Sequence, residues 1–223
     1  MTWRAVWPLL AAATLGGCAT LPTGTDGRSL DQRRDTLQSV RTWEMRGRLT
    51  VDTGDRAVQG RFNWSQDGDA LDLTVRNPLG AGILRVMGQP DALTVTARGE
   101  TRTLTDPEAE LSELIGWWLP VASLPDWLLG FPDRDFRAVT EPGSDGTLAS
   151  LEQRLWRVDY PAYGLAAIGA TGGEVLVPRR IDLTHGALTL KLTIDDWQPA
   201  ATPTAMDGGS AANAGAILRP AAP

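Results

Sequence analysis

The sequence is poor in the side chains that metal and covalent catalysis use. Its 223 residues include one histidine and one cysteine. It contains no HExxH, GxSxG or Walker sequence. Zinc chemistry and a catalytic triad are therefore excluded as interpretations, and the lone Cys18 cannot build a disulfide framework. We expect that the protein is not an enzyme and that it has no metal site and no cofactor.

The remaining candidates for chemistry are weak. Gly80-Ala81-Gly82 lacks the following helix and the third glycine of a dinucleotide site. His185 stands before a glycine in a predicted two-residue turn, where a polar residue is ordinary. Asp195 and Asp196 are neighbours on a predicted strand, so their carboxylates point to opposite faces. An unrecognised hydrolase stays as an alternative that only measured turnover would favour.

The charge pattern also excludes a class of partner. The formal net charge is −6, and the basic residues are nearly all arginines spread along the chain. An acidic and evenly mixed surface argues against nucleic acid as a partner. It does not choose among protein partners.

The N-terminus has the pattern of a secretory signal with a lipidation box. Arg4 precedes an uncharged stretch from Ala5 to Leu15, which leads into Leu15-Gly16-Gly17-Cys18. The stretch is too short for a permanent membrane helix, which needs about 20 apolar residues. We predict that residues 1–17 are removed and that Cys18 carries lipid, with a chance match as the alternative. Several acyl chains give a stable anchor, because each buried methylene contributes ~0.8 kcal/mol.

Composition marks the ends of one domain. Residues 18–28 are rich in Thr, Gly and Pro, and residues 199–223 are mainly Ala, Gly and Pro. Both segments are predicted to be disordered, the first as a lipid-anchored linker and the second as an inert tail or a docking segment. Residues 29–198 remain as a single domain, and a chain of this size buries about 70% of the surface that it exposes when unfolded.

The first half of this domain is predicted to be a helix followed by an antiparallel meander. Ser29-Leu30-Asp31-Gln32 has capping-box spacing, and apolar residues recur helically up to Trp43. From Glu44 the period is two, as in half-buried strands. Turn sequences at hairpin spacing separate the strands: Asp52-Thr53-Gly54-Asp55, Asp67-Gly68-Asp69, Gln89-Pro90-Asp91 and Arg98-Gly99-Glu100.

Helices interrupt the predicted sheet in the middle of the chain. Asp106-Pro107 is predicted to be the N-cap and the first residue of a helix. Apolar residues then recur at helical spacing from Leu111 to Trp118. A second short helix is predicted from Ser123, its possible cap, to Gly130. Strands resume near Phe136, and His185-Gly186 is predicted to join the last two. The fold class is therefore mainly β (α+β).

Tryptophan is abundant beyond the signal, and several of these residues fall on the predicted inner face. The seven are Trp43, Trp64, Trp117, Trp118, Trp127, Trp156 and Trp197. An aromatic core and an aromatic-lined cavity have the same periodicity. The pattern alone does not distinguish a solid core from a cavity.

An ordered series of short motifs resembles one known family. The motifs are Trp43, Arg46-Gly47-Arg48-Leu49, Phe62-Asn63-Trp64, Asn77-Pro78-Leu79-Gly80, Ile115-Gly116, Leu119-Pro120-Val121, Ser123-Leu124, Trp127-Leu128-Leu129-Gly130-Phe131-Pro132, Trp156-Arg157-Val158-Asp159-Tyr160 and Val177-Pro178. In order and spacing they are similar to the LolB family, the outer-membrane receptor of lipoprotein localisation. The likeness spans about Trp43 to Trp197, and the tail departs from the family.

The resemblance implies a fold and a function. The fold is a single antiparallel sheet curled into an unclosed barrel, with the central helices as a lid over an apolar cavity. The function is that of a monomeric receptor that accepts acylated lipoproteins from a periplasmic carrier similar to LolA and inserts them into outer-membrane phospholipid without nucleotide. Ala19 follows the lipidated cysteine, whereas an aspartate there resembles a signal for inner-membrane retention. A structural or adaptor lipoprotein with a solid core is the alternative from another class; the soluble carrier, which lacks the lipidation box, is the rival within the fold.

The resemblance and the alternation together assign site residues. Residues at inferred inward positions are expected to line the acyl-chain cavity: Phe62, Trp64, Leu73, Val75, Leu84, Trp118, Trp127 and Trp156. Leu79 is expected at a loop tip, where the family resemblance implies a membrane-inserting residue. Arg46, Arg48 and Arg61 are expected on an outer face that either meets the carrier or is only solvated.

Overall fold

The structure is a computed structural model that describes residues 26–168 and 173–199. The predicted signal peptide, the predicted acylation site Cys18, most of the predicted linker and all but one residue of the predicted tail (199–223) lie outside the described residues. None of the described helices is long and apolar enough to span a membrane.

The described chain forms eleven strands and a few short helices. The helices are α1 (Asp26–Gln38), α2 (Pro107–Ile115), the 3₁₀ turn η1 (Val121–Ser123) and α3 (Leu124–Leu128). The strands are β1 (Thr42–Asp52), β2 (Ala57–Asp67), β3 (Ala70–Arg76), β4 (Gly82–Gln89), β5 (Ala92–Ala97), β6 (Glu100–Thr103), β7 (Ala138–Pro142), β8 (Leu148–Gln153), β9 (Trp156–Ile168), β10 (Gly173–His185) and β11 (Leu188–Pro199).

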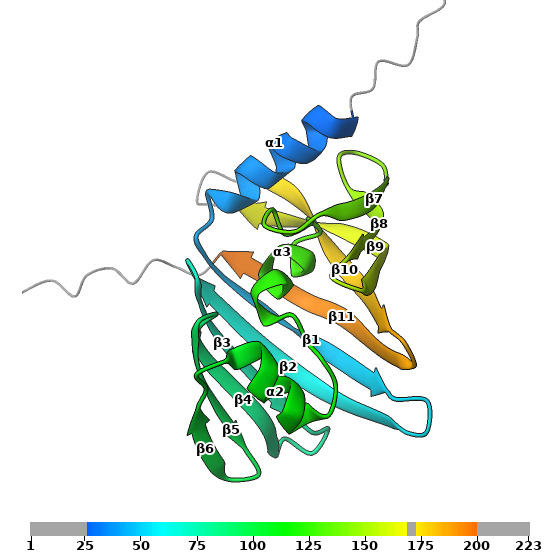
Figure 1. Ribbon diagram of the computed structural model, residues 1–223. Helices are drawn as coiled ribbons and strands as arrows, with labels where there is room; N and C mark the ends of the chain where they lie inside the picture. Colours follow the sequence, from blue (N-terminus) through cyan, green and yellow to red (C-terminus); the bar gives the residue numbers. More distant parts are fainter. Residues whose placement is uncertain (1–25, 169–172, 200–223) are drawn as a thin grey trace, which may run out of the picture.

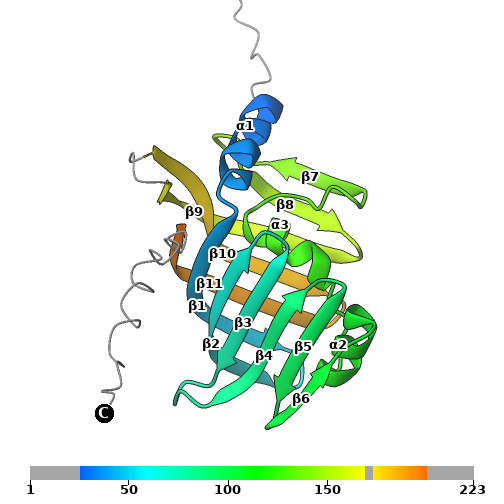
Figure 2. The same cartoon turned by 90° about the vertical axis from the view of Figure 1, so that its left-hand side faces the viewer.

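All eleven strands belong to one antiparallel sheet. Their order is β6-β5-β4-β3-β2-β1-β11-β10-β9-β8-β7, so two meanders are joined where β1 pairs with β11, for example at Met45 and Trp197. The sheet curls around α2 and α3, which lie on its inner side (Figures 1 and 2). Strands β6 and β7 stand at its two edges and are not paired with each other. The predicted class, a mainly β unclosed barrel with helices on its inner side, is confirmed.

The strands form where the apolar period is two. Along β2, Gly60, Phe62 and Trp64 are buried while Arg61 and Asn63 are exposed, so one face of the strand forms the interior. All four predicted turns of the first half are present. The turn between β10 and β11 lies one residue later than predicted: His185 pairs with Leu188, and Gly186 takes the positive φ.

Several helix boundaries differ from the prediction: α1 begins at Asp26 instead of at Ser29, and Ser123 makes no side-chain cap bond to α3, which ends at Leu128. The first helix ends at Gln38, and Trp43 lies in β1, where its ring stacks on Trp64 of β2 at 6.5 Å. The lid helix α2 is capped by Asp106 as predicted, with the carboxylate accepting from the N–H of Ala109 at 3.3 Å. It ends at Ile115, because Gly116 adopts a left-handed conformation with φ 86°, and this leaves Trp118 outside the helix.

Helix α1 is attached to the sheet by a buried arginine. Arg33 donates hydrogen bonds to the carbonyl oxygens of Leu129, Gly130, Gly146 and Leu176 at 2.8–3.0 Å. Its guanidinium also lies 4.1 Å from the ring centroid of Phe131. Burial lowers the pKa of Arg33 to about 10, which keeps the side chain charged at neutral pH. These bonds join α1 to β10, to the segment after α3 and to the loop before β8.

Candidate functional site

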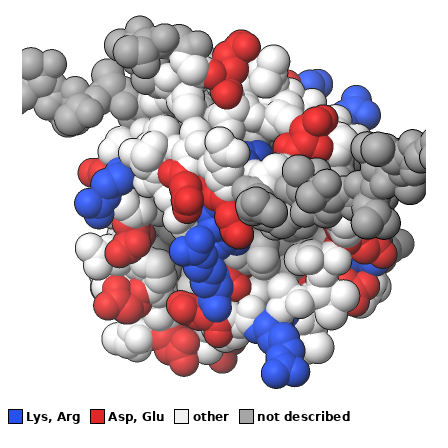
Figure 3. Space-filling view, turned by 90° about the horizontal axis from the view of Figure 1, so that it is seen from above, with Lys and Arg blue, Asp and Glu red and all other residues white. Residues whose placement is uncertain are grey.

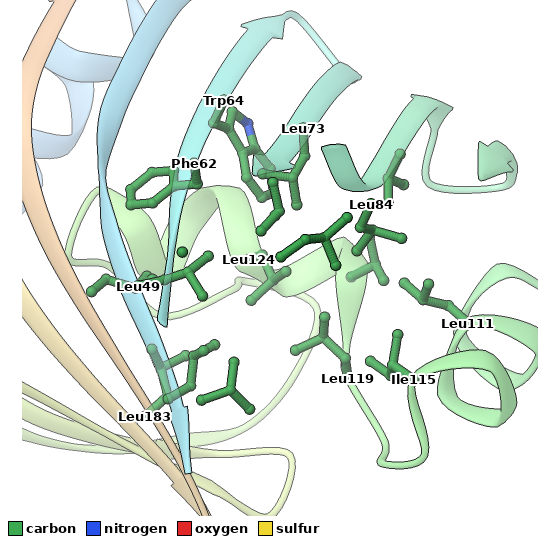
Figure 4. A pocket seen from close by; sticks show the side chains of 18 of the residues that line it. Leu49, Phe62, Trp64, Leu73, Leu84, Leu111, Ile115, Leu119, Leu124 and Leu183 are labelled. Carbon is green, nitrogen blue, oxygen red and sulfur yellow. The ribbon is translucent and has the colours of Figure 1, made fainter. Parts of the chain in front are cut away.

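The inner side of β1 to β4, β10 and β11, together with α2, α3 and the connection between these helices, encloses an apolar cavity of about 220 Å³. Figure 4 shows leucines from both the sheet and the lid pointing toward this space. Gln59 is the one lining residue with a polar side chain. The lining residues are Leu49, Val51, Val58, Gln59, Gly60, Phe62, Trp64, Leu71, Leu73, Val75, Ile83, Leu84, Val86, Leu111, Ile115, Trp117, Leu119, Val121, Leu124, Leu128, Leu183, Leu190 and Leu192. Such a wall binds apolar groups without directional preference.

Five of the eight predicted cavity residues lie on this wall. They are Phe62 and Trp64 of β2, Leu73 and Val75 of β3, and Leu84 of β4. The register explains why they meet: Phe62 pairs with Val75, Trp64 with Leu73, and Val75 with Leu84. Side chains at directly paired positions project from the same face of a sheet, so these five form one continuous surface.

The other three predicted cavity residues lie elsewhere, and their assignment is corrected. Trp127 is completely buried, and its indole N–H donates to Gln153 at 2.8 Å. Trp156 packs against it with the ring centroids 6.5 Å apart, in a solid part of the core. Trp118 lies beyond the end of α2, and its ring faces His185 at 5.9 Å. All three are inward or lid residues by periodicity, but Trp127 and Trp156 are enclosed by other side chains and Trp118 is partly exposed outside the cavity.

Several cavity residues were not among the predicted ones. Leu49 and Val51 alternate visibly in β1, so a search for the inner face of that strand would have found them. Leu111 and Ile115 share one side of α2, a signal that indicates a buried face without saying what it covers. Leu183 lies on β10, and only the long-range pairing of β1 with β11 and of β11 with β10 brings it here.

The lid is held to the rest of the molecule by a salt bridge that is mostly shielded from solvent. Arg154, in the turn between β8 and β9, makes a bidentate contact with Glu108 in the first turn of α2, at 2.7 and 2.9 Å. Its guanidinium also lies 5.1 Å from the ring centroid of Trp118 and 4.1 Å from that of Phe136. We call the pair Arg154–Glu108 the latch. It links a turn of the β7–β10 half to the lid of the other half.

The start of α2 is stabilised by a second acidic residue. The Glu110 carboxylate accepts hydrogen bonds from the N–H groups of Thr105 and Asp106 and from the Thr105 hydroxyl, at 2.7–2.9 Å. These donors lower the pKa of Glu110, with the N–H of Asp106 contributing most. The lid helix therefore begins at a polar cluster that depends on an ionised carboxylate.

Leu79 is placed at a loop tip, as predicted. Strand β3 ends at Arg76, and Leu79 follows in the turn 77–81 with 94% of its surface exposed. Gly80 has φ +92° and the N–H of Ala81 donates to the Asn77 side chain at 3.0 Å, so the loop has a defined conformation. A rigid turn thus holds a leucine in solvent.

The three arginines of the predicted outer face do share a surface. Arg48 and Arg61 are directly paired on β1 and β2, and all three side chains are exposed. Arg46 contacts Asp196 at 3.3 Å and Arg48 contacts Asp195 at 2.9 Å. Two of the three charges thus have acidic neighbours.

The described residues also lack the ligand cluster that a metal site requires. They contain no group of three or more His, Cys, Asp or Glu side chains that could hold a metal ion. On the face seen in Figure 3, at the end of the molecule that carries α1, acidic and basic side chains are interspersed. This face has no large field of one sign that would attract nucleic acid.

A curled antiparallel sheet with a helical lid over an apolar cavity defines a binding protein for apolar groups. Comparison with known proteins identifies the family within this class. The family model described as outer membrane lipoprotein LolB matches residues 41–197, and the chain belongs to this family.

Named relatives match most of the chain. The outer-membrane lipoprotein LolB of Stutzerimonas stutzeri is 32% identical over 197 residues, which cover 84% of this chain and 92% of the relative. The LolB of Nitrosococcus oceani is 33% identical over 196 residues, covering 85% and 94%. A solved structure of a LolA-superfamily protein from Nitrosomonas europaea aligns with a TM-score of 0.49 and 11% identity, over 80% of this chain and 95% of that one.

Proposed function

We propose that the protein is an outer-membrane lipoprotein receptor that takes the acyl chains of lipoproteins from a periplasmic carrier and delivers them to the inner leaflet. The observation that carries the proposal is the apolar cavity between sheet and lid, in a chain of the LolB family. Neither uptake nor delivery requires nucleotide or metal in this scheme. The acyl chains move between successive apolar environments.

Energetics explain why a receptor needs such a cavity. Acyl chains of about fifteen methylenes, at ~0.8 kcal/mol for each methylene, cannot cross water unshielded. A wall of Leu, Val, Phe and Trp side chains binds acyl chains through non-directional apolar contacts, so binding does not depend on the detailed structure of the chain. Cargo proteins can therefore differ while the lipid is the shared ligand.

The lid has to move during this cycle. A cavity of about 220 Å³ is smaller than the roughly 300–1,000 Å³ of ordinary ligand pockets, so it cannot hold several acyl chains as it stands. The sheet side of the wall is fixed by strand pairing, whereas the lid side rests on short helices and on the latch. Opening the latch and shifting α2 away from the sheet would enlarge the space.

Leu79 is assigned the role of membrane contact in this proposal. Its exposed side chain on a rigid turn can enter the apolar part of the interface. The lipid on Cys18 would keep the domain beside the membrane meanwhile. A membrane-bound native protein with an unmodified Cys18, detected by mass spectrometry, would refute the anchor.

The test is transfer of a labelled lipoprotein from its purified carrier complex to the protein and then to phospholipid vesicles, with the two steps measured separately. We expect uptake followed by delivery. Leu79→Glu should keep uptake and impair delivery, because a charged tip resists the apolar interface. No uptake of lipid by the folded wild-type protein would favour a structural adaptor, and normal delivery by Leu79→Glu would remove the assigned role of the loop.

A further inference from the structure

A second leucine is held in solvent at another tight turn of the molecule. Leu155, between β8 and β9, is 85% exposed, the highest value after Leu79 among the large apolar side chains described. The two-residue turn is closed by the pairing of Gln153 with Trp156. This turn is separate from the loop assigned to the membrane above.

The backbone of this turn is unfavourable for a leucine. Arg154 has φ 52° and Leu155 has φ 65°, the positive values that a type I′ turn requires at both positions. Asn, Asp and Gly are the usual residues there, because other side chains crowd the backbone in the left-handed region. Folding alone therefore favours a small polar residue or glycine at position 155. A leucine that is both strained and exposed points to a role outside the fold.

The strand register places this turn at the same end of the sheet as Leu79. Asp52 at the end of β1 pairs with Thr189 of β11, Thr189 with Thr184 of β10, and Thr184 with Arg157 of β9. The turns after β1, β8 and β10 thus lie at one end, and Figure 1 shows the β1–β2 and β10–β11 turns side by side.

The loop of Leu79 belongs to the same end. Arg76 at the end of β3 pairs with Arg61, four residues from the start of β2, so the loop that follows runs toward the turn between β1 and β2. Leu79 and Leu155 are carried by strands that are several places apart in the sheet. One end of the molecule therefore presents two separate apolar tips.

The cavity and its lid reach the surface near these tips. Val58 and Ile83 line the cavity close to the first residues of β2 and β4, and their side chains are 48% and 41% exposed. The lid connection lies against the second turn: the ring of Trp117 contacts that of Trp156 at 6.3 Å, and Trp156 directly follows Leu155. The two tips thus flank the side of the cavity from which apolar side chains are exposed.

We infer that Leu155 is a second membrane contact, so that this end docks on a phospholipid bilayer at two points with the cavity facing the lipid between them. The inference rests on the proposed function. A bilayer suits the surface because both tips are single leucines, which insert into an interface but offer too little area for a protein partner. Arg137 lines the same shallow depression as Leu155 and suits the phosphate groups of lipid headgroups, whereas Arg157 in that depression is paired with Glu152 and Asp159.

The test measures stability and membrane binding on one variant. In the mature chain from residue 18 with Cys18→Ala, Leu155→Asn should fold with an equal or higher Tm, because Asn tolerates positive φ. Its partition onto vesicles of phosphatidylethanolamine and phosphatidylglycerol should fall about tenfold, as expected when one leucine no longer leaves water. Leu165→Thr is the matched control, since Leu165 is 57% exposed on β9 away from this end, and it should leave partition unchanged.

Four outcomes separate the possibilities. Reduced partition with retained stability in Leu155→Asn, and wild-type partition in Leu165→Thr, support the second contact. Wild-type partition in Leu155→Asn overturns it, and loss of uptake from the carrier instead would place Leu155 in a protein interface. Failure of the wild-type protein to take up any lipoprotein would overturn the receptor proposal itself, independently of the partition onto vesicles.

Discussion

The two halves of the sheet enclose different interiors. The half from β7 to β10 is solid apart from Leu183, which reaches the cavity: Trp127 and Trp156 pack on each other there, and Arg33 ties α1 to the segments around them. The half from β1 to β6 keeps an open space, because leucines of α2 and the lid connection approach its wall without filling it. Inward apolar residues thus form either a core or a cavity, depending on what packs against them.

The largest effect should come from removing a side chain of the solid half. Trp127→Ala should lower the free energy of unfolding by about 3–5 kcal/mol, since it leaves a void and removes the donor to Gln153. Leu84→Ala, on the cavity wall, should cost less than about 2 kcal/mol, because its side chain already borders empty space. Urea denaturation of both variants measures the contrast; equal losses would mean that the cavity half is as well packed as the other. Should Trp127→Ala not fold, Trp127→Phe gives a milder comparison.

An intermediate effect is expected from the latch that joins the halves. Glu108→Gln replaces the charged partner of Arg154 and should shift the lid toward an open state by about 1 kcal/mol. An apolar fluorescent dye should then bind about fivefold more tightly. Asp72→Asn is the control, because it removes a carboxylate from the exposed pair with Arg85 far from the latch. Unchanged dye affinity in Glu108→Gln would show that the latch does not restrain the lid.

The smallest effect should be acid loosening of the lid helix. The pKa of Glu110 is lowered in the folded protein by the N–H groups of Asp106 and Thr105. A carboxyl with a depressed pKa stabilises the fold above its ordinary pKa, and this contribution is lost as the pH falls through the folded value. Dye uptake should therefore rise modestly below about pH 4.5, the ordinary value. The same rise in Glu110→Gln, which cannot titrate there, would assign the effect to other groups.

Much of this fold could be predicted from local sequence. The turn sequences and the period of two predict β1 to β6, and Asp106-Pro107 predicts the start of α2. The end of α1 was misplaced because Trp43 continues a helical recurrence while it belongs to a strand. When a residue fits both the helical and the strand period, its long-range contacts decide which structure it joins. A local sequence pattern does not contain those contacts.

The predicted part of the site lies within one meander, although Leu49 and Val51 of its first strand were not included, and the part formed by distant segments was missed. Phe62, Trp64, Leu73, Val75 and Leu84 lie on consecutive strands, so alternation was enough to bring them together. Trp127 and Trp156 have the same inward pattern but face a filled interior. Periodicity reports which face a side chain takes, and the volume left beside that side chain depends on the packing of the whole domain.

The most direct test of the account uses the adjacent pair Trp117 and Trp118, of which only the first lines the cavity. Each is replaced in turn by a photoreactive phenylalanine derivative, and the protein is loaded with lipoprotein from its carrier complex and irradiated. We expect cross-links to the acyl chains from position 117 and few from position 118. Equal cross-linking from the two positions, or none from position 117 in a loaded protein, would contradict the claim that this cavity holds the lipid.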